Sequence, residues 1–308
     1  MTSNLTHQWA ESMRRWNLEL LCIPTVVITL ATLLISPVLL TCILLSRALR
    51  QETRYLLVAN TLTADILFLV LNLATVMINS VGAQIPWLVC ELVTTIVISA
   101  YCCAILTVTL MVLDTFAAVR WPLRYHDFLT PCRTHCILVG VWILSVLYPF
   151  TSLIMVKVKE ESPHEKVTYC LAFIILKEGG IYIYFFVGAL ICTLLILYCY
   201  TRLYMVTRTQ GIWHSRFSRA RVTVLAHGVL LLLYFVPGIV FTLELYMFEK
   251  KGMSQDVHVW ISTVNCCVLM LLPRAFAPYL YGLRYREIAD TLMLLLDCHK
   301  RLTQITLS

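Results

Sequence analysis

The chain has little charge for its size. Of its 308 residues only 13% are Asp, Glu, Lys or Arg, whereas 60% are hydrophobic, and soluble domains carry about a quarter charged residues. Seven stretches are nearly free of charge: Leu20–Ser46, Tyr55–Cys90, Leu92–Leu113, Cys136–Val156, Gly179–Thr201, Val222–Leu243 and Val257–Leu283. Each has at least the roughly 20 helical residues that cross a bilayer core. The sequence therefore predicts an all-α fold, a seven-transmembrane helix bundle, and excludes a soluble globular domain.

The signals of an enzyme are also missing. No His/Cys set with metal-ligand spacing and no nucleophile motif lies on an exposed loop. Loops of about 8 to 20 residues leave little room for a soluble catalytic domain. We therefore expect no enzyme, no cofactor and no metal. A transporter or channel is disfavoured, because such proteins usually carry several intramembrane ionisable groups or inverted repeats.

The positive charges predict the orientation in the membrane. Fifteen of the 24 Lys and Arg residues fall on the side of the C-terminal tail, eight on the other side, and Arg274 lies within a span. Since cytoplasmic loops carry the excess of Lys and Arg, we expect residues 1–17 outside the cell, residues 18–283 as the seven-transmembrane domain and residues 284–308 in the cytoplasm. The net charge of +7 thus reflects topology and does not indicate nucleic-acid binding.

Three features outside the spans predict membrane attachment or modification. After the last span, Tyr285, Ile288, Ala289, Leu292 and Leu296 recur at helical spacing, which is typical of a short amphipathic interfacial helix. Beyond it, Cys298 is either palmitoylated or a free cytosolic thiol. Asn4 begins an Asn-Leu-Thr glycosylation sequon. The sequence shows no cleavable signal peptide that would remove this segment, and the sequon is either glycosylated or present by chance.

A set of motifs distributed over the spans carries a family resemblance. Leu113-Asp114-Thr115-Phe116 is followed by Arg120-Trp121-Pro122-Leu123-Arg124-Tyr125, and further marker residues stand at matching spacings in other spans: Asp65, Trp142, Tyr200, Phe235-Val236-Pro237 and Pro278-Tyr279-Leu280-Tyr281. Jointly they resemble the rhodopsin-like class of G-protein-coupled receptors. Leu272-Pro273-Arg274 and Tyr281-Gly282-Leu283-Arg284 are similar to a vertebrate orphan branch of the class and, in part, to fish odorant receptors.

The resemblance implies a ligand-activated receptor at the plasma membrane. Its partners would be a small-molecule ligand, a heterotrimeric G protein, arrestin and the membrane lipids. A disulfide would join Cys90 to Cys170, and the residues implied in activation are Asp114, Thr115, Phe116, Tyr200, Pro237, Pro278 and Tyr281.

By the same resemblance, one set of inward-facing residues would line the ligand site. Its members are Val97, Tyr101, Tyr184, Phe235, Ile239, Thr242 and Cys267. Val97 stands where amine receptors carry an aspartate, so the lining is apolar and aromatic, as in small-molecule cavities. We expect an uncharged, lipophilic or odorant-like ligand; for any one residue, plain helix packing is the alternative.

Asp65 and Arg274 are charged residues within predicted spans. We expect them to form an ion pair, because an unpaired charge in a bilayer costs roughly 2.5–3.5 kcal/mol. In the class, this region holds a sodium ion, but Ala104 and Ala277 replace residues that usually supply its ligands. Alternatively, Arg274 extends toward the cytosolic interface.

The other departures concern activation. Pro37 replaces the class asparagine of the first span, and Phe235 replaces a tryptophan. Thr115 replaces the class arginine, so we expect weak G-protein coupling and an Asp114 carboxylate that turns to Arg120, Arg124, Arg219 or Arg221. Thr115 also supports the alternative of a non-signalling seven-helix protein, a decoy or trafficking partner, unless another residue compensates.

Overall fold

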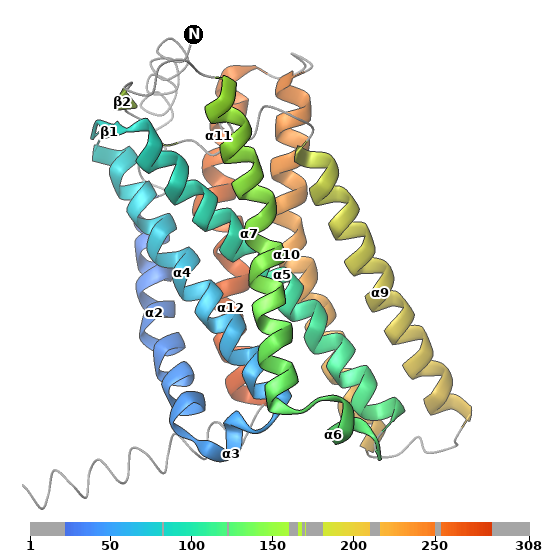
Figure 1. Ribbon diagram of the computed structural model, residues 1–308. Helices are drawn as coiled ribbons and strands as arrows, with labels where there is room; N and C mark the ends of the chain where they lie inside the picture. Colours follow the sequence, from blue (N-terminus) through green and yellow to red (C-terminus); the bar gives the residue numbers. More distant parts are fainter. Residues whose placement is uncertain are drawn as a thin grey trace, which may run out of the picture.

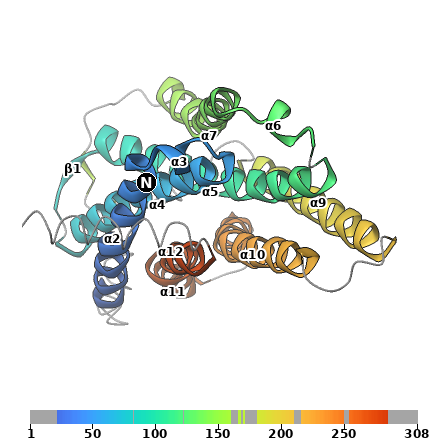
Figure 2. The same cartoon turned by 90° about the horizontal axis from the view of Figure 1, so that it is seen from below.

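The computed structural model describes residues 22–81, 83–121, 123–159, 166–167, 170, 181–209, 216–249 and 254–284, though not every side chain within them. These residues form a bundle of long, roughly parallel helices (Figure 1). Seen along the bundle, α4, α5 and α9 form a middle row, with α7 on one side and α2, α12 and α10 on the other (Figure 2). The predicted all-α bundle is confirmed.

Seven helical segments correspond to the seven charge-poor stretches. Six are continuous helices: α2 Cys22–Leu45, α4 Thr53–Val81, α5 Trp87–Arg120, α7 Pro131–Lys159, α9 Ile181–Thr209 and α10 Arg216–Glu249. The seventh is built from α11 Gln255–Val264, the π-helical turn η2 Asn265–Leu269 and α12 Leu272–Arg284. Short elements connect them: α3 Arg47–Arg50, α6 Tyr125–Phe128, and the antiparallel strands β1 Ile85–Pro86 and β2 Lys166–Val167.

Hydropathy within the described residues supports membrane insertion. Five of these segments are long and apolar enough to cross a bilayer: Ile23–Leu45, Thr53–Val81, Trp87–Arg120, Pro131–Thr151 and Asp256–Tyr281. In α9 and α10 the described apolar parts are shorter, Val187–Arg202 and Gly228–Glu244. Leu34 and Val81 illustrate the outer faces, where large apolar side chains are exposed, as expected for contact with lipid.

The helix α5 is the centre of the bundle, in contact with α4, α7, α9 and α10. A polar cluster anchors two of these neighbours. Asn60 of α4 donates to the Thr107 hydroxyl of α5 at 2.9 Å and accepts from the indole N–H of Trp142 on α7 at 2.9 Å. Because an amide in an apolar interior needs partners for both its N–H and its C=O groups, Asn60 fixes the mutual register of three helices.

The helix ends differ from the limits of the charge-poor stretches. The stretch Tyr55–Cys90 contains the end of α4, the strand β1 and the first turn of α5, and Glu91 lies inside α5. A charge-poor run marks the apolar zone, whereas a helix ends where its backbone hydrogen bonds end, so the two limits need not coincide. The last span is likewise broken by η2, a π-bulge of the kind often found at functional sites.

Candidate functional site

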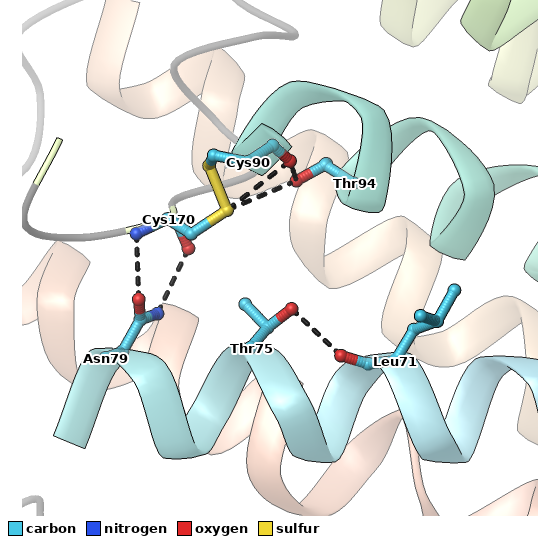
Figure 3. Close-up of a disulfide and its surroundings, with 6 residues drawn as sticks. All are labelled: Leu71, Thr75, Asn79, Cys90, Thr94 and Cys170. Carbon is cyan, nitrogen blue, oxygen red and sulfur yellow. Dashed lines mark hydrogen bonds between the residues drawn. A yellow bond between two sulfur atoms is a disulfide. The ribbon is translucent and has the colours of Figure 1, made fainter. Parts of the chain in front are cut away.

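A disulfide closes one end of the bundle, called here the disulfide end. Cys90, in the first turn of α5, is bonded to Cys170 with a Cα–Cα distance of 5.5 Å (Figure 3), which confirms the predicted bridge. Asn79 of α4 holds the same segment: its amide oxygen accepts from the Cys170 N–H at 2.8 Å and its amide N–H donates to the Cys170 carbonyl at 3.0 Å. A covalent bond and a two-point amide contact thus tie residue 170 to α5 and α4.

An ion pair lies in the centre of the bundle. The Nε of Arg274 on α12 is 3.4 Å from the Asp65 Oδ1 on α4, and both side chains are fully buried. Arg274 also donates to the Met270 carbonyl, and its Cζ lies 3.4 Å from the ring centroid of Phe68. The structure therefore places Arg274 across the bundle against Asp65, not along the helix toward an interface.

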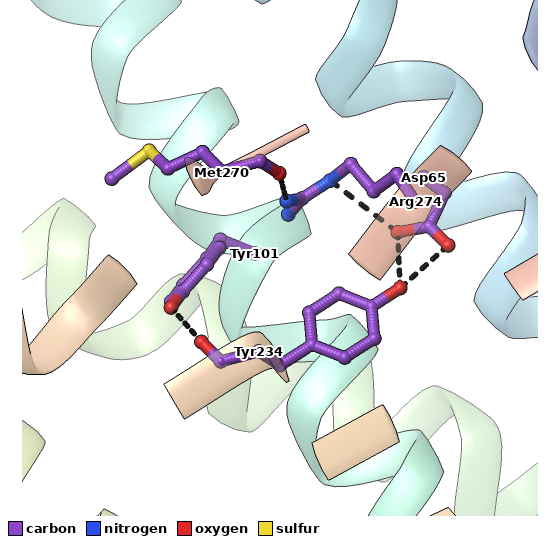
Figure 4. A network of polar contacts seen from close by, with 5 residues as sticks. All are labelled: Asp65, Tyr101, Tyr234, Met270 and Arg274. Atoms are coloured by element: carbon purple, nitrogen blue, oxygen red, sulfur yellow. Dashed lines mark hydrogen bonds and ion pairs between the residues drawn. The ribbon is translucent and has the colours of Figure 1, made fainter. Parts of the chain in front are cut away.

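Two tyrosines complete this central network (Figure 4). The hydroxyl of Tyr234, on α10, donates to both carboxylate oxygens of Asp65, at 2.8 and 2.7 Å. The hydroxyl of Tyr101, on α5, donates to the Tyr234 backbone carbonyl. Arg274 lies 5.2 Å from the Tyr101 ring and 5.4 Å from the Tyr234 ring. Four helices thus meet around one buried carboxylate, and Tyr234 is a member that the sequence reasoning missed.

The central network does not fit a sodium ion. Asp65 is engaged by Arg274 and Tyr234, and a cation beside it would face the Arg274 charge. Ala104 and Ala277, both fully buried, have methyl groups where oxygen ligands would be needed. The arginine therefore takes the role of counter-charge for Asp65.

The residues expected to line a ligand site are only partly brought together. Tyr101 and Phe235 are buried in one apolar cluster, with Val97 packed against it. Thr242 is buried, but its hydroxyl bonds to the carbonyls of its own helix, at Gly238 and Ile239.

Three further predicted residues do not extend this cluster. Ile239 is 38% exposed on the outer face of α10. Cys267 is buried beside α2, where its carbonyl accepts from the Thr25 hydroxyl at 3.1 Å. Tyr184 lies on α9, but its side chain is outside the described part of the structure.

Buried charge is not confined to Asp65 and Arg274, contrary to the reading of the sequence. Glu244, near the end of α10, is buried with its Oε1 2.7 Å from the Nδ1 of His258 on α11, and Glu91 on α5 is also fully buried. Glu244 and Glu91 directly flank charge-poor stretches, so the charge pattern of the sequence alone does not assign them to the spans. The helices α5 and α10 run past the limits of the charge-poor stretches, and this extension is what places Glu91 and Glu244 inside the bundle.

At the opposite end, called the α6 end, Asp114 pairs with a tyrosine. The hydroxyl of Tyr125, on α6, donates to the Asp114 Oδ1 at 2.6 Å. The expectation of Arg120 or Arg124 as partner was wrong: α5 ends at Arg120, whose guanidinium instead faces the Trp121 ring at 6.0 Å.

The chain geometry explains this exchange of partners. Beyond α5 the chain turns back, and α6 returns the Tyr125 side chain to Asp114. The side chains of Arg219 and Arg221 lie outside the described residues.

Tyr125 is well suited to this contact. Burial, reinforced by the neighbouring Asp114 carboxylate, raises the pKa of the Tyr125 phenol, so the hydroxyl keeps its proton and remains a donor near neutral pH. Thr115 takes no part, because its own hydroxyl bonds to the Met111 carbonyl one turn earlier, at 2.9 Å. The structure thus gives Asp114 a neutral hydrogen-bond donor as its direct partner.

The remaining activation residues divide into two groups. Phe116 packs edge-on against Tyr198 of α9 at 6.2 Å between centroids, and Tyr281 of α12 donates to the Met111 sulfur at 3.8 Å. Pro237 lies inside α10 and Pro278 inside α12. Tyr200, in contrast, is 42% exposed on α9, and the buried neighbour Cys199 takes the inward position.

The predicted modification sites Asn4 and Cys298, and the predicted interfacial helix, lie outside the described residues.

Comparison with known proteins agrees with this architecture. The family model described as 7 transmembrane receptor (rhodopsin family) matches residues 15–270. A human relative, "Probable G-protein coupled receptor 148", is 33% identical over 289 residues, covering 90% of this chain and 81% of the relative. The mouse 5-hydroxytryptamine receptor 1D is 25% identical over 228 residues, covering 71% of this chain and 59% of the relative. The chain therefore belongs to the rhodopsin family of seven-transmembrane receptors and is a multi-pass membrane protein.

Proposed function

We propose that this receptor transduces the binding of a small, uncharged, lipophilic or odorant-like ligand to a heterotrimeric G protein. The disulfide end, with residues 1–17, faces the exterior of the plasma membrane, and the α6 end with residues 284–308 faces the cytoplasm, where arrestin and anionic lipids are further partners. The observation that carries the proposal is the central network, which joins α4, α5, α10 and α12 at one buried carboxylate. Such a junction lets a ligand near α5 and α10 bias the arrangement of the helices.

The buried charges support an uncharged ligand. Asp65 already has Arg274 as its counter-charge, and the Glu244 carboxyl group is in contact with the His258 imidazole, so neither group needs a cationic ligand as a partner. The mouse relative is named for an amine, 5-hydroxytryptamine, but Val97 occupies the position at which the resemblance places the amine-binding aspartate. We therefore do not propose an amine ligand for this receptor.

Thr115 predicts that coupling is weak. In the class, the arginine of this position packs against the inserted helix of the G protein, which the Thr115 side chain, bonded to its own helix, is too short to do. An interaction of this kind contributes roughly 1.5–3 kcal/mol. Its loss lowers the affinity for the G protein by up to about a hundredfold.

The test is a panel of G-protein activation assays, run first without ligand and then with lipid and odorant libraries. Thr115→Arg should raise coupling by up to about a hundredfold. The matched control is Thr115→Met, which places a long side chain without the charge at the same position and should leave coupling unchanged.

One outcome would contradict the weak coupling predicted from Thr115, and another would contradict the receptor function. If wild type already couples as strongly as Thr115→Arg, another residue compensates for the arginine. If neither protein activates any G protein in the panel, the non-signalling alternative replaces the receptor function.

A further inference from the structure

One residue of α10, Tyr234, is bonded to two other helices at once. Its side chain is completely buried, and its hydroxyl donates to both oxygens of Asp65 on α4. Its backbone carbonyl accepts from the Tyr101 hydroxyl of α5. A hydrogen bond to a carboxylate is stronger than one between neutral groups, and here water does not compete with it. Tyr234 therefore fixes the middle of α10 against both α4 and α5.

This attachment lies one turn from a proline inside α10. Pro237 has no amide N–H, so the helix is weakened there. The Tyr101 hydroxyl donates to the Tyr234 carbonyl, the group that a regular α-helix pairs with the N–H of Gly238.

A second side chain acts on the same segment of α10 from the last span. The Asn265 amide of η2 donates to the Pro237 carbonyl at 3.0 Å. Side chains of α5 and η2 thus hold the weak segment of α10 from two elements, and its shape depends on them.

The charge balance of the centre keeps Tyr234 in place. Arg274 lies 3.4 Å from Asp65 and is surrounded by the rings of Phe68, Tyr101 and Tyr234. Because Arg274 offsets the carboxylate charge, Asp65 is held as an acceptor for the Tyr234 hydroxyl. At the α6 end the corresponding carboxylate, Asp114, is engaged by Tyr125 of α6, which is not a residue of α10.

We propose that Tyr234 is a positioning residue that holds α10 in its resting arrangement, so that a restraint on this helix lies in the centre of the bundle. The role rests on the proposed function, in which a ligand near α5 and α10 biases the arrangement of the helices. Tyr101 supplies the link to the ligand: its ring is buried in the apolar core of the bundle, to which Phe235 also belongs, and its hydroxyl holds the α10 backbone. A ligand that shifts the Tyr101 ring loosens α10 at Pro237.

The test measures the position of α10 by the distance between two spin labels, without any G protein. One label is placed on the exposed Cys132 of α7 and the other on α10 through Thr223→Cys, with Cys22→Ser, Cys136→Ser and Cys298→Ser to keep the labelling specific. Tyr234→Phe removes only the hydroxyl, and it should raise the ratio of open to closed arrangements about 10- to 100-fold, as expected for the loss of a charge-assisted hydrogen bond.

The matched control is Tyr279→Phe, the same change on a side chain that is 51% exposed on α12, which should leave the distances as in wild type. If Tyr234→Phe fails to fold, Tyr101→Phe removes the other bond to the same residue and should open α10 in the same direction.

The outcomes separate the proposal from the receptor function. If Tyr234→Phe and Tyr101→Phe lower thermal stability but keep the wild-type distances, the two tyrosines are merely structural and the proposal is wrong. Opening of α10 without G-protein activation upholds the role of Tyr234 and counts against the receptor function alone. Ligand-driven activation with unchanged distances in Tyr234→Phe upholds the function and overturns this role.

Discussion

Both the centre of the bundle and its α6 end contain a helical carboxylate, Asp65 and Asp114 respectively, but the partners of the two carboxylates differ. In the centre, Asp65 has a cation and a tyrosine as partners, and all are fully buried. At the α6 end, Asp114 and Tyr125 are half-buried, and the direct partner is neutral. Removing one member of a buried pair strands a charge away from water, whereas water replaces a lost partner at an exposed end. The centre should therefore dominate both stability and the position of α10.

The largest effect is expected from breaking the central pair. Asp65→Asn or Arg274→Met alone should destabilise the receptor by about 3–5 kcal/mol, because each leaves one buried charge without its partner. The double variant Asp65→Asn/Arg274→Met should regain much of that loss. Thermal unfolding of the detergent-solubilised protein measures the three variants.

The exposed ion pair between Glu52 and Arg54 is the matched control. Its atoms are 3.2 Å apart, but the side chains are 38% and 44% exposed. Glu52→Gln and Arg54→Met should each change stability by less than about 1 kcal/mol. Equal losses of stability from the two pairs, or additive losses in the central double variant, would show that burial does not make the central pair more important for stability.

A smaller effect is expected when the same hydroxyl is deleted in each region. Tyr234→Phe should cost about 1.5–3 kcal/mol of stability, because its hydroxyl bonds to a buried carboxylate. Tyr125→Phe should cost about 1 kcal/mol or less, because water reaches the half-buried Asp114 in its place. Chemical unfolding of the two variants in parallel compares them, and a larger loss for Tyr125→Phe would reverse the order of the two regions.

Much of the fold was predictable, because the exclusion of charge from a bilayer acts on every span. The disulfide was also predictable, through the family resemblance. Tyr234 was not: as one of 15 tyrosines, it is distinguished only by its position opposite Asp65. Tyr125 replaced the expected arginines because the turn after α5, and not sequence distance, decides which side chain returns to Asp114.

Two further differences from the sequence-based expectation lie beside or within the last span. The contact between Glu244 and His258 joins α10 to α11 across a loop, so no local pattern indicates it. The π-helical turn at Asn265–Leu269 adds a residue to one turn of the span, which shifts the faces of all residues that follow. Regular α-helical periodicity along this span therefore cannot predict the faces of both Cys267 and Arg274.

The most direct test of the central ion pair is the response of thermal stability to sodium. Wild-type receptor should unfold at the same temperature in sodium chloride and in potassium chloride of equal concentration, because Arg274 already supplies the counter-charge of Asp65. Arg274→Met, which removes that charge, is the matched variant in which any sodium dependence should first appear. A sodium-specific rise in the unfolding temperature of wild type would show that Asp65 is free to bind the ion, and would contradict the central pair.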